Sequence, residues 1–316
     1  MKVYVKTPAR LHLGLIDFNG DLGRFFGGLG VGINRPNVIL EAQKSVSLAI
    51  TGEENERVKE LVNDFIKAYK LETNVRINVK QSIPEHVGLG SGTQLSLAIA
   101  TALSRLFDIK ASFRELSQAM GRGQRTSVGT TIFKKGGLVV DGGKSISNKT
   151  FPATIFRQPF PPDWVFVVVI PEVKKGLSKS AENAAFKALA PMKAEDVGRI
   201  CRLIMMKLLP SLVERDIRSF GEALTQIQIV IGNYFAEVQG GTYSSKIVAE
   251  GIKLLQRLGA YGTGQSSWGP AFYGLTQKSR AKEIETMIKT FLKKNVGGQV
   301  FVAKANNRGA YIKITR

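Results

Sequence analysis

The chain has 316 residues, of which 43% are hydrophobic and 22% are charged, a composition that excludes a disordered or low-complexity protein. Its formal net charge of +20 favours anionic partners, either a nucleic acid or a highly charged small molecule. One cysteine and two histidines exclude an internal disulfide and a zinc cluster, and the longest apolar run, Trp164 to Ile170, is too short to cross a membrane.

The first residues alternate like a strand and carry no apolar signal-peptide region, so we expect a cytoplasmic protein. Hydrophobic spacing in the N-terminal half predicts several further elements. They are strands at 3–5, 11–15, 38–50 and 75–79, a glycine-rich loop over 17–32, and helices at 54–69, 95–107 and 113–122.

Prolines cluster between residues 145 and 163, which indicates a boundary. We therefore expect two lobes, 1–160 and 161–316. In the second lobe we expect a buried strand at 164–170 and two long helices separated by Pro210. Cys201, in the first of these helices, is expected to pack in the core. Strands and helices mix in both halves, so the predicted fold class is α+β.

The segment Ile83 to Gln94 is the clearest functional signal. Its three alternate glycines, Gly88, Gly90 and Gly92, permit backbone conformations that side chains would block, and an apolar helix follows directly. Ser91 or Thr93 is the expected N-cap. Unpaired N–H groups at a helix start attract an anion, so the loop predicts a phosphate site. The alternative is a glycine-rich turn that only starts a helix.

Glycine-rich polar loops recur at 7–32, 84–94 and 262–270. Their recurrence predicts that the three loops form one cleft, lined at its base by backbone amides. This arrangement resembles the GHMP kinase superfamily. The matching motifs are Pro8-Ala9-Arg10, the segment Pro84 to Gly92, and, more loosely, Gly262 to Gly269. The resemblance implies a two-lobed fold in which mixed sheets pack against helices.

The kinases of this superfamily usually carry an acidic residue after the second motif. Here no carboxylate occurs between Glu115 and Asp141, and Arg122 and Arg125 stand in that region. A guanidinium binds anions and does not accept protons at neutral pH. Phosphoryl transfer by the usual route of the superfamily is therefore not expected.

One branch of the superfamily resembles the chain more closely. Ala9 to Asp17, Arg24 to Ile33 and the Gly88–Gln94 loop together resemble the β-ribofuranosylaminobenzene 5′-phosphate synthases. That resemblance implies a decarboxylating phosphoribosyltransferase of methanopterin biosynthesis. Such an enzyme joins phosphoribosyl pyrophosphate (PRPP) to 4-hydroxybenzoate or 4-aminobenzoate and releases carbon dioxide and pyrophosphate. A Mg²⁺ cofactor and a homodimer are also implied.

The expected site residues fall into three groups. The phosphate-binding residues are Gly88, Gly90, Ser91, Gly92, Thr93, Arg24 and Arg122. The catalytic residues are His12, Arg10 and Arg125, with His12 contacting the substrate or moving a proton from its para hydroxyl. The metal ligands are Asp17 and Asp141.

Several alternatives remain open at the level of sequence. His12 is equally a half-buried structural histidine, Asp17 a residue that caps the following loop, and Arg122 and Arg125 solvated charges at a helix end. Two other functions are also consistent with the sequence. One is an ATP-dependent small-molecule kinase of the same superfamily, and the other is a nucleic-acid-binding protein that uses its positive surface.

Overall fold

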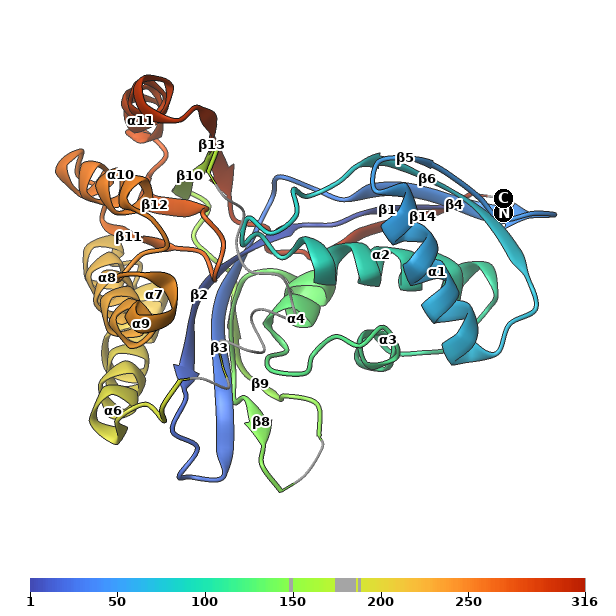
Figure 1. The fold of residues 1–316 in the computed structure, drawn as a ribbon, viewed down its shortest axis with the longest axis horizontal. Coiled ribbons are helices and arrows are strands. Elements are labelled where there is room, and N and C mark those ends of the chain that lie inside the picture. Colours follow the sequence, from blue (N-terminus) through green and yellow to red (C-terminus); the bar gives the residue numbers. More distant parts are fainter. Residues whose placement is uncertain (148–149, 174–185, 187–188, 316) are drawn as a thin grey trace.

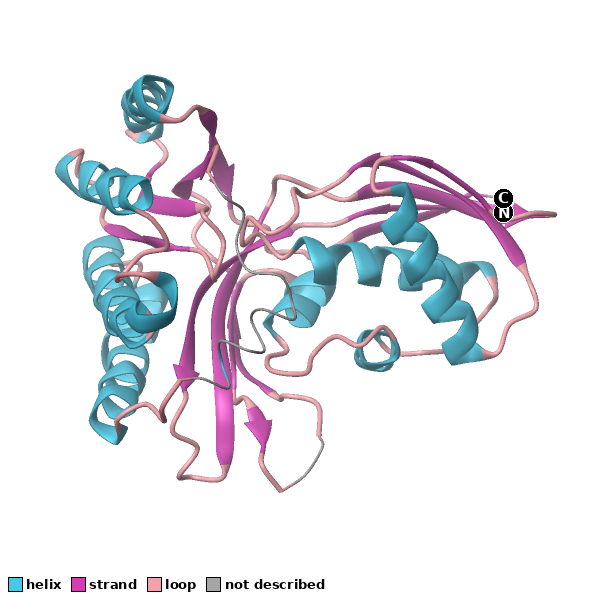
Figure 2. Ribbon diagram, viewed as in Figure 1, coloured by secondary structure: helices cyan, strands magenta, loops and turns pink. Residues whose placement is uncertain are grey.

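The computed structural model describes residues 1–147, 150–173, 186 and 189–315, which form three β-sheets and the helices packed on them (Figure 1). Within these residues no helix is long and apolar enough to cross a membrane. Figure 2 shows the strands running through the middle of the molecule, with helices on both sides. The predicted α+β class is confirmed.

The first sheet combines strands from both ends of the chain and has the strand order β14-β1-β4-β6-β5. Its strands are β1 (Lys2–Lys6), β4 (Ile39–Ser45), β5 (Ala49–Gly52), β6 (Asn74–Gln81) and β14 (Tyr311–Thr315). All pairs are antiparallel except β5 with β6, which are joined through helix α1 (Asn55–Tyr69). The last strand, β14, thus returns to the sheet that contains the first, and the two termini lie together (Figure 1).

Helix α2 (Ser91–Leu106) packs on this sheet and against α1, α3 (Phe113–Ala119) and α4 (Val128–Lys135). Nearly all of its side chains from Gln94 onward are buried, including the polar Gln94, Ser96, Thr101 and Ser104, because the sheet and three helices surround it. Burial on all sides holds the helix firmly, so its N-terminus keeps a defined position at the centre of the molecule.

The second sheet joins the lobes and has the order β2-β3-β7-β9, with β8 (Lys144–Ser145) pairing with β3. Its strands are β2 (Ala9–Asp17), β3 (Arg24–Ile33), β7 (Leu138–Asp141) and β9 (Thr154–Gln158). The expected loop over 17–32 was therefore wrong in its larger part, since β3 is a strand. A Cβ at Gly28 would lie 2.8 Å from Val128 Cγ2, so the absent side chain lets α4 approach this strand.

The third sheet, in the C-terminal lobe, has the order β11-β12-β10-β13. Its strands are β10 (Trp164–Pro171), β11 (Gly262–Gln265), β12 (Phe272–Gln277) and β13 (Gly298–Lys304), and β10 confirms the predicted buried strand. The helices of this lobe are α6 (Ala194–Leu203), α7 (Leu209–Glu214), α8 (Ile217–Tyr234), α9 (Ala236–Gln239), α10 (Lys246–Arg257) and α11 (Ala281–Asn295), with a π-helical turn at Ile204–Leu208.

Two expectations for this lobe were wrong. Pro210 does not separate the long helices, because helical backbone continues from α6 through the π-helical turn and past Pro210 into α7. The break comes at Arg215, whose φ is 61°, and Asp216 then caps α8. Cys201 is exposed rather than packed in the core.

Candidate active site

Helix α2 begins at Ser91, and its N-cap is Gly90 in the left-handed conformation, with φ 80° and no side-chain cap. The expectation that Ser91 or Thr93 caps the helix was wrong, because both residues already lie within its first turn. The N–H groups of Ser91, Gly92 and Thr93 therefore have no acceptor within the helix. All three residues line a large cavity, so the predicted anion site is open to a ligand.

The three glycine-bearing segments meet around this turn, as predicted. The Oγ of Ser266 accepts a hydrogen bond from the backbone N–H of His12 at 2.9 Å and donates one to Gly88 O at 2.7 Å. Gly88 has a φ of 92°, and a Cβ there would lie 2.0 Å from Ser266 O. Arg10 N also donates to Leu89 O at 3.0 Å. These contacts hold residues 84–94 between β2 and the segment that follows β11. We call residues 84–94 the phosphate loop, after the ligand that the sequence predicts for them.

Two guanidinium groups stand over the start of α2. A Cβ at Gly92 would lie 3.0 Å from Arg122 Nη1 and 3.2 Å from Arg57 Nη2. Arg122 Nε donates to Ser96 Oγ at 3.0 Å, which fixes its position. Burial and the neighbouring charge of Arg57 lower the pKa of Arg122. Two like charges this close to the positive end of a helix form an environment suited to an anion with more than one negative charge.

Arg57 was not among the predicted site residues. It projects from α1 and is held by ion pairs with Glu54, at 3.2 Å, and with Glu85. Its sequence context is an ordinary amphipathic helix with many charged residues, so no local signal distinguished it. Only the packing of α1 beside α2 brings its guanidinium to Gly92.

Two neighbouring cavities lie here, which we call the outer and inner chambers. The outer chamber has a volume of about 660 Å³ and is lined by the phosphate loop, Arg57 and Arg122, while the inner chamber has a volume of about 170 Å³. Both are lined by the same five residues, Arg10, Arg125, Thr126, Ser267 and Trp268. These five therefore form the junction between the chambers.

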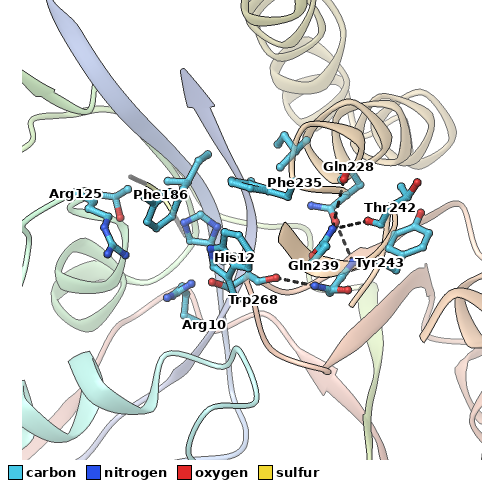
Figure 3. A pocket seen from close by; sticks show the side chains of 17 residues that line it. Arg10, His12, Arg125, Phe186, Gln228, Phe235, Gln239, Thr242, Tyr243 and Trp268 are labelled. Atoms are coloured by element: carbon cyan, nitrogen blue, oxygen red, sulfur yellow. Dashed lines mark hydrogen bonds between the residues drawn. The ribbon is translucent and has the colours of Figure 1, made fainter. Parts of the chain in front are cut away.

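The inner chamber is walled by aromatic rings, notably Phe186, Phe235 and Trp268 (Figure 3). The ring centroids of Phe235 and Trp268 lie 4.5 Å apart, and the Arg125 guanidinium lies 4.4 Å from the centroid of Phe186. Figure 3 shows Arg10 and Arg125 at one side of this chamber and a group of amide and hydroxyl side chains at the other. Such a space suits a flat ring with polar groups at both ends.

His12 also lines the inner chamber and is buried. Burial, together with the nearby charge of Arg10, lowers the pKa of His12 well below its usual value. The imidazole is therefore neutral at neutral pH, and one of its ring nitrogens can accept a hydrogen bond or a proton.

Three predicted site residues lie elsewhere. Arg24, Asp17 and Asp141 line a separate apolar pocket beside Cys201, not the cavity at the phosphate loop. The Arg24 guanidinium donates to the carbonyls of Gly142 and Gly143, so it holds the β7–β8 turn. The structure thus does not bring Arg24 to the anion site.

The two aspartates are occupied by backbone groups. Asp17 Oδ1 accepts from Asn19 N at 2.7 Å and Gly20 N at 2.9 Å, which matches the alternative of a loop-capping residue. Asp141 accepts from the N–H groups of Ser127, Val128 and Gly143, at 2.7, 3.1 and 2.9 Å, and so caps α4. Neither carboxylate is placed to meet a metal ion bound at the phosphate loop.

The described residues contain no cluster of three or more His, Cys, Asp and Glu side chains that could hold a metal ion. Three carboxylates, those of Glu56, Glu60 and Glu85, do line the outer chamber. The inner chamber has no carboxylate among its described lining residues.

Comparison with known proteins places this geometry in a family. Residues 56–133 match the model of the GHMP kinase N-terminal domain, and residues 208–294 match that of the GHMP kinase C-terminal domain. The β-ribofuranosylphenol 5′-phosphate synthase of Archaeoglobus fulgidus is 36% identical, covering 98% of this chain and 99% of the relative. The chain belongs to the β-ribofuranosylphenol 5′-phosphate synthase family. Its branch of the superfamily, predicted from the sequence, is confirmed.

A second synthase of this name, from Methanothermobacter thermautotrophicus, is 31% identical and covers 99% of both chains. Solved structures extend the likeness of the synthase fold to kinases. Lactococcus lactis galactokinase superposes with a TM-score of 0.71 at 13% identity, covering 98% of this chain and 95% of its own. The homoserine kinase of Cytophaga hutchinsonii gives 0.69 at 16% identity, with coverage of 99% and 97%. At these identities the superpositions establish the fold alone, and it is the GHMP kinase fold that the sequence predicted.

Proposed function

We propose that this protein joins PRPP to 4-hydroxybenzoate, releasing carbon dioxide and pyrophosphate, as a step of methanopterin biosynthesis. The phenol in the names of its relatives favours the 4-hydroxy acid over the 4-amino acid. The observation that carries the proposal is the two-chamber cavity. An anion-binding chamber and an aromatic chamber meet at Arg10 and Arg125, as a reaction between a pyrophosphorylated sugar and an aromatic acid requires.

PRPP would occupy the outer chamber. The free N–H groups of Ser91, Gly92 and Thr93 and the guanidinium groups of Arg57 and Arg122 offer donors and positive charge to its phosphates. The same groups stabilise the charge that builds on pyrophosphate as it departs, which makes them useful in the transition state. The excess of basic residues would speed the capture of both anionic substrates.

The aromatic acid would occupy the inner chamber with its carboxylate toward Arg10 and Arg125. That orientation follows from the chemistry, because the ring carbon that bears the carboxylate must reach C1′ of the ribose at the junction. The para substituent then points to the far end of the chamber. Phe186, Phe235 and Trp268 would hold the ring by stacking and edge contacts.

In the reaction, the bond from C1′ to the pyrophosphate oxygen breaks and its electron pair leaves with pyrophosphate. The ring carbon donates an electron pair to C1′, and the para oxygen supplies electron density to the ring. The bond to the carboxylate then breaks, its electrons restore aromaticity, and carbon dioxide leaves. No protein nucleophile takes part. The neutral His12 would accept a hydrogen bond from the substrate or relay its proton.

Magnesium would enter with the pyrophosphate group rather than in a protein cage. Mg²⁺ is commonly held by one or two carboxylates together with substrate phosphates. Glu56, Glu60 and Glu85 and the hydroxyls of Ser91 and Thr93 line the outer chamber and provide suitable oxygen donors. Bound there, the ion would neutralise the leaving group.

We also propose a homodimer, which light scattering of the purified protein would test.

The test is to incubate the protein with PRPP, Mg²⁺ and 4-hydroxybenzoate labelled in its carboxyl group, and to measure labelled carbon dioxide. Release that depends on PRPP, with one pyrophosphate formed for each carbon dioxide, supports the proposal. The main competitor is an ATP-dependent kinase, given the fold. Absence of carbon dioxide together with ATP consumption in the presence of homoserine or another small alcohol would establish the kinase instead.

A further inference from the structure

The polar end of the inner chamber is built from side chains that backbone groups hold in a fixed orientation. Gln228 Nε2 donates to Leu13 O at 2.6 Å, and its Oε1 accepts from the backbone N–H of Gln265 at 2.9 Å. Gln265 Nε2 donates to Ser267 O at 3.0 Å, and its Oε1 accepts from Ser244 N at 2.8 Å. Backbone partners thus fix the orientation of both amides, because a carbonyl can only accept and an N–H can only donate.

Gln239 is oriented in the same way. Its Nε2 donates to Thr242 O at 2.9 Å and to Gly232 O at 3.4 Å, so both N–H bonds are taken. What Gln239 can offer to a ligand is the acceptor atom Oε1. Thr242 Oγ1 donates its proton to Asn233 Oδ1 at 2.8 Å, so it too can only accept from a ligand.

Gln239 and Thr242 line the chamber across from the two arginines (Figure 3). We propose that these two acceptors select aromatic acids that carry a hydrogen-bond donor para to the carboxylate. The inference rests on the proposed function, which sets the carboxylate at Arg10 and Arg125. A para hydroxyl group donates to one of the two acceptors and a para amino group can donate to both, whereas a methyl group, a halogen or an ionised oxygen leaves both unpaired.

The two acceptors determine which para substituents bind, and they also determine the protonation state of the bound substrate. The acceptors hold the para hydroxyl in its protonated form, since an anionic oxygen beside Oε1 and Oγ1 would be repelled. An acceptor that the bound ring shields from water without giving it a partner costs about 1–3 kcal/mol, which corresponds to roughly a 5- to 150-fold loss of affinity. Both 4-hydroxybenzoate and 4-aminobenzoate should therefore bind, and 4-methylbenzoate should bind roughly 5- to 150-fold more weakly.

The experiment is calorimetric titration of the protein, with Mg²⁺ and pyrophosphate present, by 4-hydroxybenzoate and by 4-methylbenzoate, which is nearly equal in size but has no donor. The same titrations are made on Gln239→Leu and Thr242→Val. Thr290→Val is the control, because Thr290 lies exposed on α11, does not line the chamber, and donates its hydroxyl hydrogen bond to Thr286 O at 3.1 Å within its own helix. Thermal unfolding verifies that each variant is folded.

The wild type and Thr290→Val should bind 4-hydroxybenzoate more tightly than 4-methylbenzoate. In Gln239→Leu and in Thr242→Val, the ratio of the two affinities should fall toward one. Equal affinity of the wild type for the two acids overturns the inference, and this result does not depend on any variant folding. Carbon dioxide release with PRPP, measured in parallel, separates the outcomes. Release without para selectivity refutes only the role of the two acceptors, whereas absence of both binding and release refutes the proposed function as well.

Discussion

Replacement of Gly92 by alanine should weaken anion binding without lowering the stability of the fold. The added methyl group would lie 3.0 Å from Arg122 Nη1 and 3.2 Å from Arg57 Nη2, so both guanidinium groups must move by a few tenths of an ångström. They lie at the ends of flexible side chains and can move without disturbing the backbone. Alanine also favours a helix over glycine by roughly 0.5–1 kcal/mol, so the protein should unfold at the same or a slightly higher temperature.

Binding should behave differently from stability. Each hydrogen bond from a guanidinium to a phosphate oxygen contributes about 1.5–3 kcal/mol. Displacing one of them should weaken pyrophosphate binding by roughly 10- to 150-fold. Calorimetric titration with magnesium pyrophosphate measures this loss, and urea unfolding measures the stability. Gly198→Ala is the matched control, because Gly198 lies in helix α6 with no atom within 4 Å of its added Cβ.

The control should gain stability and keep its affinity for pyrophosphate. Unchanged affinity in a well-folded Gly92→Ala protein would refute the placement of phosphate between the two arginines and the start of α2. A large loss of stability would show instead that Arg57 and Arg122 serve mainly to hold the fold together.

Three other predictions follow from particular contacts. Arg125→Ala should weaken the binding of 4-hydroxybenzoate at least tenfold and lower stability modestly, with the lost cation–π contact to Phe186 contributing about 1 kcal/mol; a collapse of the melting temperature would mark a structural arginine. Gly88→Ala should destabilise the protein strongly, because its Cβ would lie 2.0 Å from Ser266 O at a φ of 92°, and near-normal unfolding in urea would contradict the clamped loop. Burial raises the pKa of Asp141 from 3.8 to about 6. At pH values between these two, the carboxyl group of Asp141 therefore keeps its proton in the folded state and has lost it in the unfolded state. Stability relative to Asp141→Asn should therefore fall by at most about 3 kcal/mol as the pH rises from about 4 to 6, and a flat or rising difference between the two unfolding curves would refute this.

Much of the molecule was predictable because its signals are local. The loop at 84–94 stood out because alternate glycines directly precede an apolar helix, and the buried strand at 164–170 because seven consecutive apolar residues need cover on both faces. The family followed from three motifs, and the meeting of their loops is seen at Ser266, which bonds to both His12 and Gly88.

The remaining features depend on tertiary structure. Arg24 and Arg122 are alike as residues in a sequence, yet one holds the carbonyls of a turn and the other stands over the start of α2. Likewise, the carboxylate of Asp141 accepts hydrogen bonds from backbone N–H groups and does not face the cavity. Arg57, which no sequence pattern singled out, reaches the start of α2. The chain alone determined which kind of protein this is, since motifs and hydrophobic spacing are properties of neighbouring residues. Only the packing of distant segments decided which charged side chains face the cavity, because a long flexible side chain is directed by what surrounds it in space.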